Sequence, residues 1–145
     1  MHRRFLLAVP ICLICLSLVQ AREDILSFPI EPVLESEHGK AKLVDVALYF
    51  GDQTHPKVVK EIGEWSTSKK TNAFHKADQE ACDWAFLSAL ITMQQRALRE
   101  GGNAVINIKS NYKNVETSSR TEYRCGAGNV VAGVAIKGTV VKIGK

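Results

Sequence analysis

The chain has 145 residues, of which 46% are hydrophobic and 23% are charged, with ten glycines and four prolines. This composition is that of one globular domain, and it excludes a collagen-like fibre, a polytopic membrane protein and a mostly disordered chain. Without Arg3 and Arg4, 17 Lys and Arg remain against 15 Asp and Glu, a net charge of +2, so charge gives no argument for binding nucleic acid.

The first 21 residues are predicted to be a secretory signal peptide. They contain a positive start at Arg3 and Arg4, an uncharged apolar stretch over residues 5–19, and small side chains at the −3 and −1 positions before a cleavage site after Ala21. An uncleaved membrane anchor is the alternative, although the stretch is shorter than the roughly 20 residues that span a bilayer. We therefore expect a periplasmic or secreted product that begins at Arg22 and has no stable membrane anchor.

Residues 22–40 are expected to form a flexible N-terminal arm before a compact domain over residues 41–145. The arm contains Pro29, Pro32, many acidic residues and no sustained periodicity, which is typical of a tether. Its few apolar side chains also suit docking on the domain or on a partner.

Alternating apolar residues predict that the domain opens with a strand over residues 42–50. A weaker strand is expected over residues 58–67, and a polar loop follows it up to Asn72. Three further strands are predicted over residues 104–112, 115–125 and 130–143.

The clearest predicted element is a helix over residues 77–100, which contains no glycine or proline and is followed by Gly101 and Gly102. One apolar stripe is expected to pack on the sheet: Cys82, Phe86, Ala89, Met93 and Ala97. A second apolar group lies on nearly the opposite side: Trp84, Leu87, Ile91 and Leu98. Because a helix on one sheet buries only one stripe, the second group is predicted to meet the arm, a long loop or another subunit, and it is the candidate partner or oligomer interface.

The order of these elements predicts an α+β fold, a single small domain with an antiparallel-rich sheet of four to five strands covered by one long helix. Cys82 and Cys125 are the two cysteines left after signal cleavage, and in an oxidising compartment such a pair is expected to form a disulfide. A bridge between residues 43 positions apart contributes roughly 4 kcal/mol of stability. A reactive or metal-bound thiolate is the alternative.

Motifs for catalysis are missing from the sequence, which contains no complete phosphate-binding loop, no Gly-x-Ser-x-Gly elbow and no His-Glu-x-x-His pair. We assign no catalytic residue and no cofactor. We also assign no metal site. The alternative hypothesis is a metal site at His75, Asp78 and Cys82, whose spacing places them on one helical face if the helix extends back to His75.

The segment 97–108, Ala-Leu-Arg-Glu-Gly-Gly-Asn-Ala-Val-Ile-Asn-Ile, follows a long helix and precedes a glycine-bearing strand. In this it resembles the YbjQ-like family of small heavy-metal-binding-type domains, and most of all its exported RcsF-like branch. The resemblance covers about residues 42–143. It implies a compact domain used in binding or signalling, and in the YbjQ-like branch ring-like oligomers. The chain departs from the exported branch in having no lipidation signal and one predicted bridge in place of two.

These observations together predict a non-enzymatic exported module that binds an envelope protein partner or itself, in envelope-stress or related signalling. A metal-binding or metal-sensing periplasmic protein is the second hypothesis, and an enzyme of unrecognised type is the third.

Overall fold

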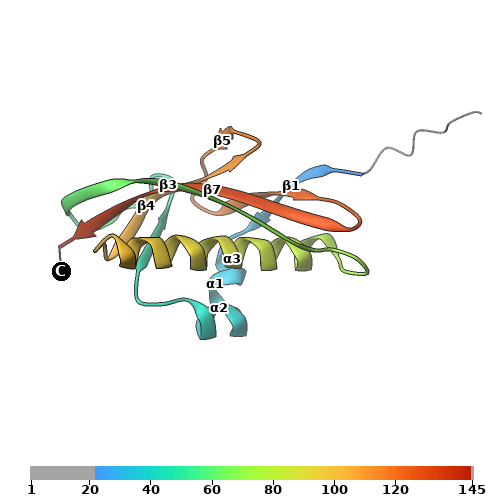
Figure 1. The fold of residues 1–145 in the computed structure, drawn as a ribbon, viewed down its shortest axis with the longest axis horizontal. Helices are drawn as coiled ribbons and strands as arrows, with labels where there is room; N and C mark the ends of the chain where they lie inside the picture. Colours follow the sequence, from blue (N-terminus) through green and yellow to red (C-terminus); the bar gives the residue numbers. More distant parts are fainter. Residues whose placement is uncertain (1–21, 145) are drawn as a thin grey trace, which may run out of the picture.

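The computed structural model describes residues 22–144, so the predicted signal peptide lies outside the described residues. Ten elements follow one another along the chain (Figure 1): β1 (Asp24–Pro29), α1 (Glu31–Glu35), α2 (Glu37–Lys42), β2 (Ala47–Phe50), β3 (Val58–Asn72), α3 (Asp78–Arg99), β4 (Ala104–Tyr112), β5 (Val115–Thr117), β6 (Glu122–Ala127) and β7 (Val131–Ile143).

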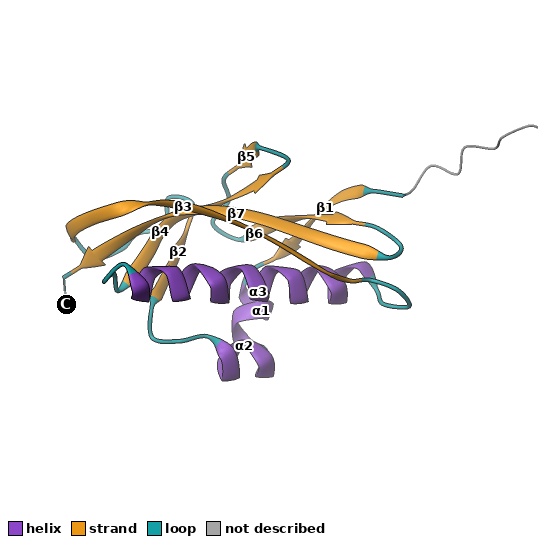
Figure 2. Cartoon of the chain, in the orientation of Figure 1, coloured by secondary structure: helices purple, strands orange, loops and turns teal. Residues whose placement is uncertain are grey.

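The long strand β7 organises the sheet. Along one edge it pairs with β3 over the whole length of that strand, from Val58↔Ile143 to Asn72↔Val131. Along its other edge it pairs first with β6 and then with β4, so the sheet divides into two branches, β6–β1 and β4–β2. β2 runs parallel to β4, and the other pairs are antiparallel. Figure 2 shows α3 lying along one face of this sheet.

The predicted α+β class and the single long helix are confirmed, but the predicted size of the sheet is wrong. It has seven strands and mixed direction, and two short helices accompany α3. The predicted core stripe of α3 is confirmed, since all five of its side chains are buried in one core with the inward-facing residues of the sheet.

The expectation of a flexible arm over residues 22–40 is corrected by β1, α1 and α2. β1 pairs with β6 in an unbroken register from Asp24↔Ala127 to Pro29↔Glu122. Both prolines occupy permitted positions, because Pro29 ends an edge strand and Pro32 lies in the first turn of α1, where the missing N–H costs no helical hydrogen bond. The pairing partner lies about 100 positions away, so local pattern did not reveal this strand.

The predicted strand over residues 42–50 is shortened to Ala47–Phe50 because Gln94 holds the preceding segment in another conformation. Its side chain is 2% exposed. The amide oxygen accepts the N–H of Val44 at 2.9 Å, and the amide nitrogen donates to the carbonyls of Val44 and Val46 at 3.1 and 2.9 Å. A buried amide on α3 therefore replaces the strand pairing that alternation had predicted.

Two further boundaries differ from the prediction. The expected polar loop up to Asn72 is part of β3, since its side chains alternate between the two faces of an edge strand. The expected strand over residues 115–125 is divided into β5 and β6, because the Ser119 hydroxyl accepts the N–H groups of Thr121 and Glu122 and forms a local turn.

The glycine pair after α3 forms a Schellman motif. The N–H of Gly101 donates to Leu98 and that of Gly102 donates to Ala97, at 3.2 and 2.8 Å. Gly101 has φ +81 in open space, whereas a Cβ at Gly102 would meet Val140 Cγ1 at 2.5 Å. The next residue, Asn103, exchanges two side-chain hydrogen bonds with the backbone of Ile143 in β7.

We expect Gly102→Ala to lower the free energy of unfolding by about 1–3 kcal/mol, because the added methyl group overlaps Val140. Gly101→Ala is the matched control, since it adds only the cost of a left-handed conformation, about 1 kcal/mol. Urea unfolding of the two variants measures both values. Equal losses would contradict the close approach at Gly102.

Candidate functional site

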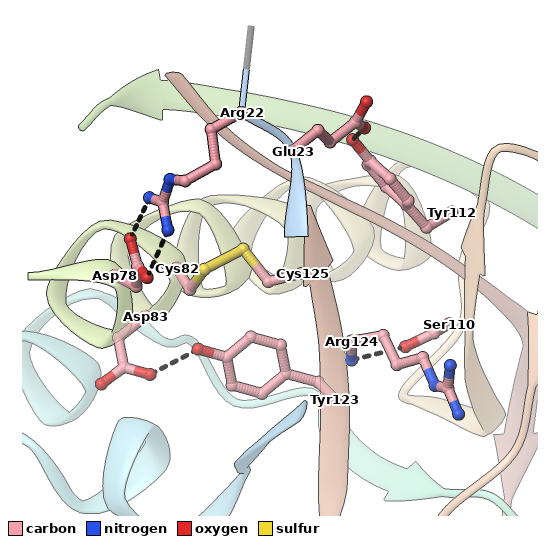
Figure 3. Close-up of a disulfide and its surroundings, with 10 residues drawn as sticks. All are labelled: Arg22, Glu23, Asp78, Cys82, Asp83, Ser110, Tyr112, Tyr123, Arg124 and Cys125. Atoms are coloured by element: carbon pink, nitrogen blue, oxygen red, sulfur yellow. Dashed lines mark hydrogen bonds and ion pairs between the residues drawn. A yellow bond between two sulfur atoms is a disulfide. The ribbon is translucent and has the colours of Figure 1, made fainter. Parts of the chain in front are cut away.

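The disulfide Cys82–Cys125 joins α3 to β6. Its Cα atoms lie 5.9 Å apart, and both residues are fully buried. Strand β6 is otherwise attached to β7 by two register pairs, Gly126↔Gly133 and Ala127↔Ala132. The covalent bond therefore ties the β6–β1 branch to the helix beneath it (Figure 3).

A second link between β6 and α3 lies beside the disulfide. The Tyr123 ring stacks on Phe86 with centroids 4.0 Å apart, and its hydroxyl donates a hydrogen bond to the Asp83 carboxylate (Figure 3). Burial raises the pKa of Tyr123, so its hydroxyl remains the donor. Burial also raises the pKa of Asp83, and the hydrogen bond from Tyr123 opposes that shift in part.

Polar contacts also connect the two branches of the sheet. The Ser110 hydroxyl of β4 accepts the N–H of Arg124 in β6 at 3.0 Å. Tyr112, also of β4, donates to the Glu23 carboxylate at 2.6 Å. Burial, and to a smaller extent this hydrogen bond, raises the pKa of Tyr112 to about 12. These contacts hold the start of β1 and the middle of β6 against β4.

The first described residue is anchored to the start of α3. Arg22 forms an ion pair with Asp78 at 2.7 Å, and this hydrogen bond lowers the pKa of the Asp78 carboxyl. The pair lies beside the disulfide (Figure 3), so three contacts from the N-terminal region and β6 converge on the first two turns of α3.

A groove of about 190 Å³ lies between α1, α2 and the same part of α3. We call it the α1–α3 groove, and its lining residues are Pro32, Val33, Ser36, His38, Glu80, Asp83, Trp84 and Leu87. Trp84 forms its aromatic wall, with the His38 ring 4.5 Å away and the Lys42 ammonium 5.3 Å away. Glu80 and Asp83, on the same face of α3 as Trp84, add two carboxylates to the lining.

A larger groove of about 570 Å³ lies on the other side of α1, between that helix and β2. This α1–β2 groove is lined by Leu34 and Leu48, with Glu31 and Glu35 at its rim. Its amide and guanidinium groups already have partners in the chain, since Gln53 bonds to the backbone and Arg120 pairs with Asp52. α1 is thus a ridge with a groove along each side.

The second apolar group predicted on the helix is divided by the structure. Leu87 is only 3% exposed, because α1 covers it through Val33, so its assignment to an intermolecular interface is wrong. Trp84 and Ile91 are partly buried, and Leu98 is 54% exposed. The sequence left the arm, a long loop or another subunit as possible cover for this apolar group. In the structure, the N-terminal segment covers its first half, around Trp84 and Leu87.

The predicted metal ligands do not form a common site. Cys82 is consumed by the disulfide, Asp78 is paired with Arg22, and His75 lies in a turn with φ 58, stacked on Phe74. Within residues 22–144, no group of three or more His, Cys, Asp or Glu side chains is arranged to hold a metal ion. The ligand set His75, Asp78 and Cys82 is therefore corrected, because oxidation removes the thiolate that it needs.

Several residues of this region have no role predicted from sequence. Pro32 and Val33 of the α1–α3 groove fall within the predicted arm, and Tyr123, which contacts Asp83 and Phe86 beside the groove, falls within the strand predicted over residues 115–125. A signal for Tyr123 was present, since it shares its strand face with Cys125 and would follow that cysteine toward the helix.

The chain has no match among family models, curated proteins or solved structures. Among the helices formed by residues 22–144, none contains an apolar stretch that could span a bilayer.

Removing the bridge by the double substitution Cys82→Ala/Cys125→Ala should lower the free energy of unfolding by about 4 kcal/mol, because the unfolded chain regains the entropy that the closed loop had removed. Urea unfolding of oxidised wild type and the variant measures the loss. The double variant avoids the free buried thiol that a single substitution would leave. A loss below about 1 kcal/mol would contradict the role of the bridge in holding β6 to α3.

Asp83→Asn should change how stability depends on pH. Because burial raises the pKa of Asp83 above its ordinary value of 3.8, the folded chain binds this proton more readily than the unfolded chain. Asp83 thus adds stability as pH falls through the raised pKa toward 3.8, and the gain is lost as pH rises. Urea unfolding from neutral pH to about pH 4 should show the wild type gaining on the variant. A difference that is constant with pH would contradict this.

Proposed function

We propose that the chain is a non-enzymatic exported module that binds a protein partner in the cell envelope, in signalling of the RcsF-like type. The binding surface is α1 together with the α1–α3 and α1–β2 grooves. The disulfide Cys82–Cys125 supports an exported location, because such bridges persist in oxidising compartments.

The α1–α3 groove carries the proposal. Its volume of about 190 Å³ is below the range of roughly 300–1,000 Å³ usual for small-molecule sites, and it suits one anchoring side chain of a partner. Trp84 is partly exposed and provides the apolar contact, over a floor formed by the nearly buried Val33 and Leu87. An aromatic side chain in a pocket is typical of an energetic hot spot at an interface.

Charge around α1 defines the chemistry of the partner. Four carboxylates border the grooves: Glu31, Glu35, Glu80 and Asp83. Lys40 pairs with Glu35, Arg120 pairs with Asp52, and the Lys42 ammonium lies over the Trp84 ring. Tyr123 donates to Asp83, so among residues 22–144 Glu31 and Glu80 are the two of these carboxylates that have no side-chain partner in the chain. A partner segment that combines an apolar anchor with flanking Lys or Arg therefore fits this surface best.

Trp84→Ala should weaken binding by at least about 2 kcal/mol, roughly thirtyfold, because it removes the wall of the anchor pocket. Leu98→Ala is the matched control, since it also removes an apolar side chain from α3 but at an exposed site outside the grooves. Photo-crosslinking from Pro32 in the exported compartment identifies the envelope protein, and titration of that purified protein measures binding by the full chain and both variants.

Charge reversal at Glu31 tests the electrostatic part in the same titration. Glu31→Lys should lower the association rate and weaken the salt dependence of binding, since the rim carboxylate attracts a basic segment. Equal affinity of wild type and Trp84→Ala, or capture from Leu98 but not from Pro32, would contradict the proposed surface.

A further inference from the structure

The outer edge of β3 is a second surface, separate from α1. Among the strands in residues 22–144, β3 pairs with β7 alone, so one of its edges carries backbone N–H and C=O groups without a strand partner. Its register with β7 is unbroken from Gly63 to Asn72. Figure 2 shows β3 and β7 as the long strands over α3.

Side chains along this stretch alternate between the two faces of the sheet. Glu64, Ser66, Ser68 and Lys70 are exposed on the outer face, where Glu64 pairs with Lys137 of β7 at 3.1 Å. Trp65 lies on the inner face, with the guanidinium of Arg96 5.7 Å from its ring. A Cβ at Gly63 would touch the Trp65 ring, so the glycine makes room for the indole beside the edge.

The geometry points to a two-fold dimer in which β3 pairs antiparallel with β3 of a second copy, centred on Thr67. In this register each Glu64 lies opposite Lys70 of the other copy, on the outer face, and the pair occurs twice by symmetry. On the inner face Trp65 lies opposite Lys69, which suits a cation–π contact. Ser66 lies opposite Ser68, and both hydroxyls can exchange a hydrogen bond.

Neighbouring two-fold registers are less complementary. Centring on Ser66 places Lys70 opposite Ile62, and centring on Ser68 places Glu64 opposite Asn72. Centring on Trp65 places Glu61 opposite Lys69, but it also places Lys60 opposite Lys70, and both pairs fall beyond the irregularity of β3 between Glu61 and Gly63. Centring on Lys69 places that lysine opposite itself, which repels. The charges of β3 therefore disfavour random edge pairing and favour the arrangement centred on Thr67 with a second copy of this chain.

Single cysteines introduced at three consecutive positions test the register, using the full chain recovered after export. Thr67→Cys should give a disulfide-linked dimer on a non-reducing gel, because the residue faces itself across the axis. Ser66→Cys and Ser68→Cys should not, because the two copies of either residue are offset by two positions, about 8 Å between Cα atoms, which exceeds disulfide reach. Wild type controls for linkage through its own cysteines.

Charge exchange tests the pairing itself by analytical ultracentrifugation. Lys70→Glu should raise the dimer dissociation constant about tenfold, since two attractive pairs become repulsive. Adding Glu64→Lys to the Lys70→Glu variant should restore dimerisation, because positions 64 and 70 then carry opposite charges again, with the signs exchanged. Lys60→Glu is the matched control, with the same charge change on the same strand but outside the paired stretch.

Cross-linking at residue 66 or 68 in place of 67 would overturn the proposal, as would a wild type that remains monomeric at all concentrations. Failure of Glu64→Lys to rescue Lys70→Glu would also overturn it. If Thr67→Cys instead links to a different exported protein, the edge belongs to a strand of that protein and self-pairing is wrong. None of these outcomes depends on the α1 surface, because β3 contributes no residue to either groove beside α1.

Discussion

The attachment of the β6–β1 branch to α3 is the constraint on which the rest of the structure depends. Only two register pairs join β6 to the central strand β7, which is little backbone pairing for a branch that carries the N-terminal part of the domain. The bond between Cys82 and Cys125, with the stack and hydrogen bond of Tyr123 next to it, supplies the missing attachment. Covalent and side-chain contacts thus replace strand pairing where the sheet divides.

The surface around α1 is built on this attachment. β1 pairs with β6, and α1 follows β1 after a single residue, so the position of α1 over α3 is inherited from β6. The same bridge that stabilises the fold therefore also sets the shape of both grooves. The Gly-Gly-Asn junction after α3 has a different role, because Gly102 and Asn103 fasten the end of α3 to β7 and line neither groove.

Much of the fold was predictable from local pattern, because the elements concerned carry their own signals. α3 has an uninterrupted apolar stripe and a Gly-Gly stop, and β4 and β7 alternate apolar residues that face the helix. β1 and the shortened β2 were not predictable, since one depends on pairing with β6 and the other on hydrogen bonds from Gln94. For the site, Trp84 was identified from sequence, but the elements that form a groove with it were not.

Sequence by itself determined the class of the fold and the long helix with its buried stripe, because periodicity is a local property. It also predicted the pairing of Cys82 with Cys125, the two cysteines that follow the predicted signal peptide, and the structure contains that bridge. Tertiary structure alone decided that residues 24–42 join the domain, that Leu87 is covered, and that the three expected metal ligands are separated. These outcomes depend on contacts between segments far apart in the chain. A burial pattern shows that a face needs cover, but only the packed structure shows which segment provides it.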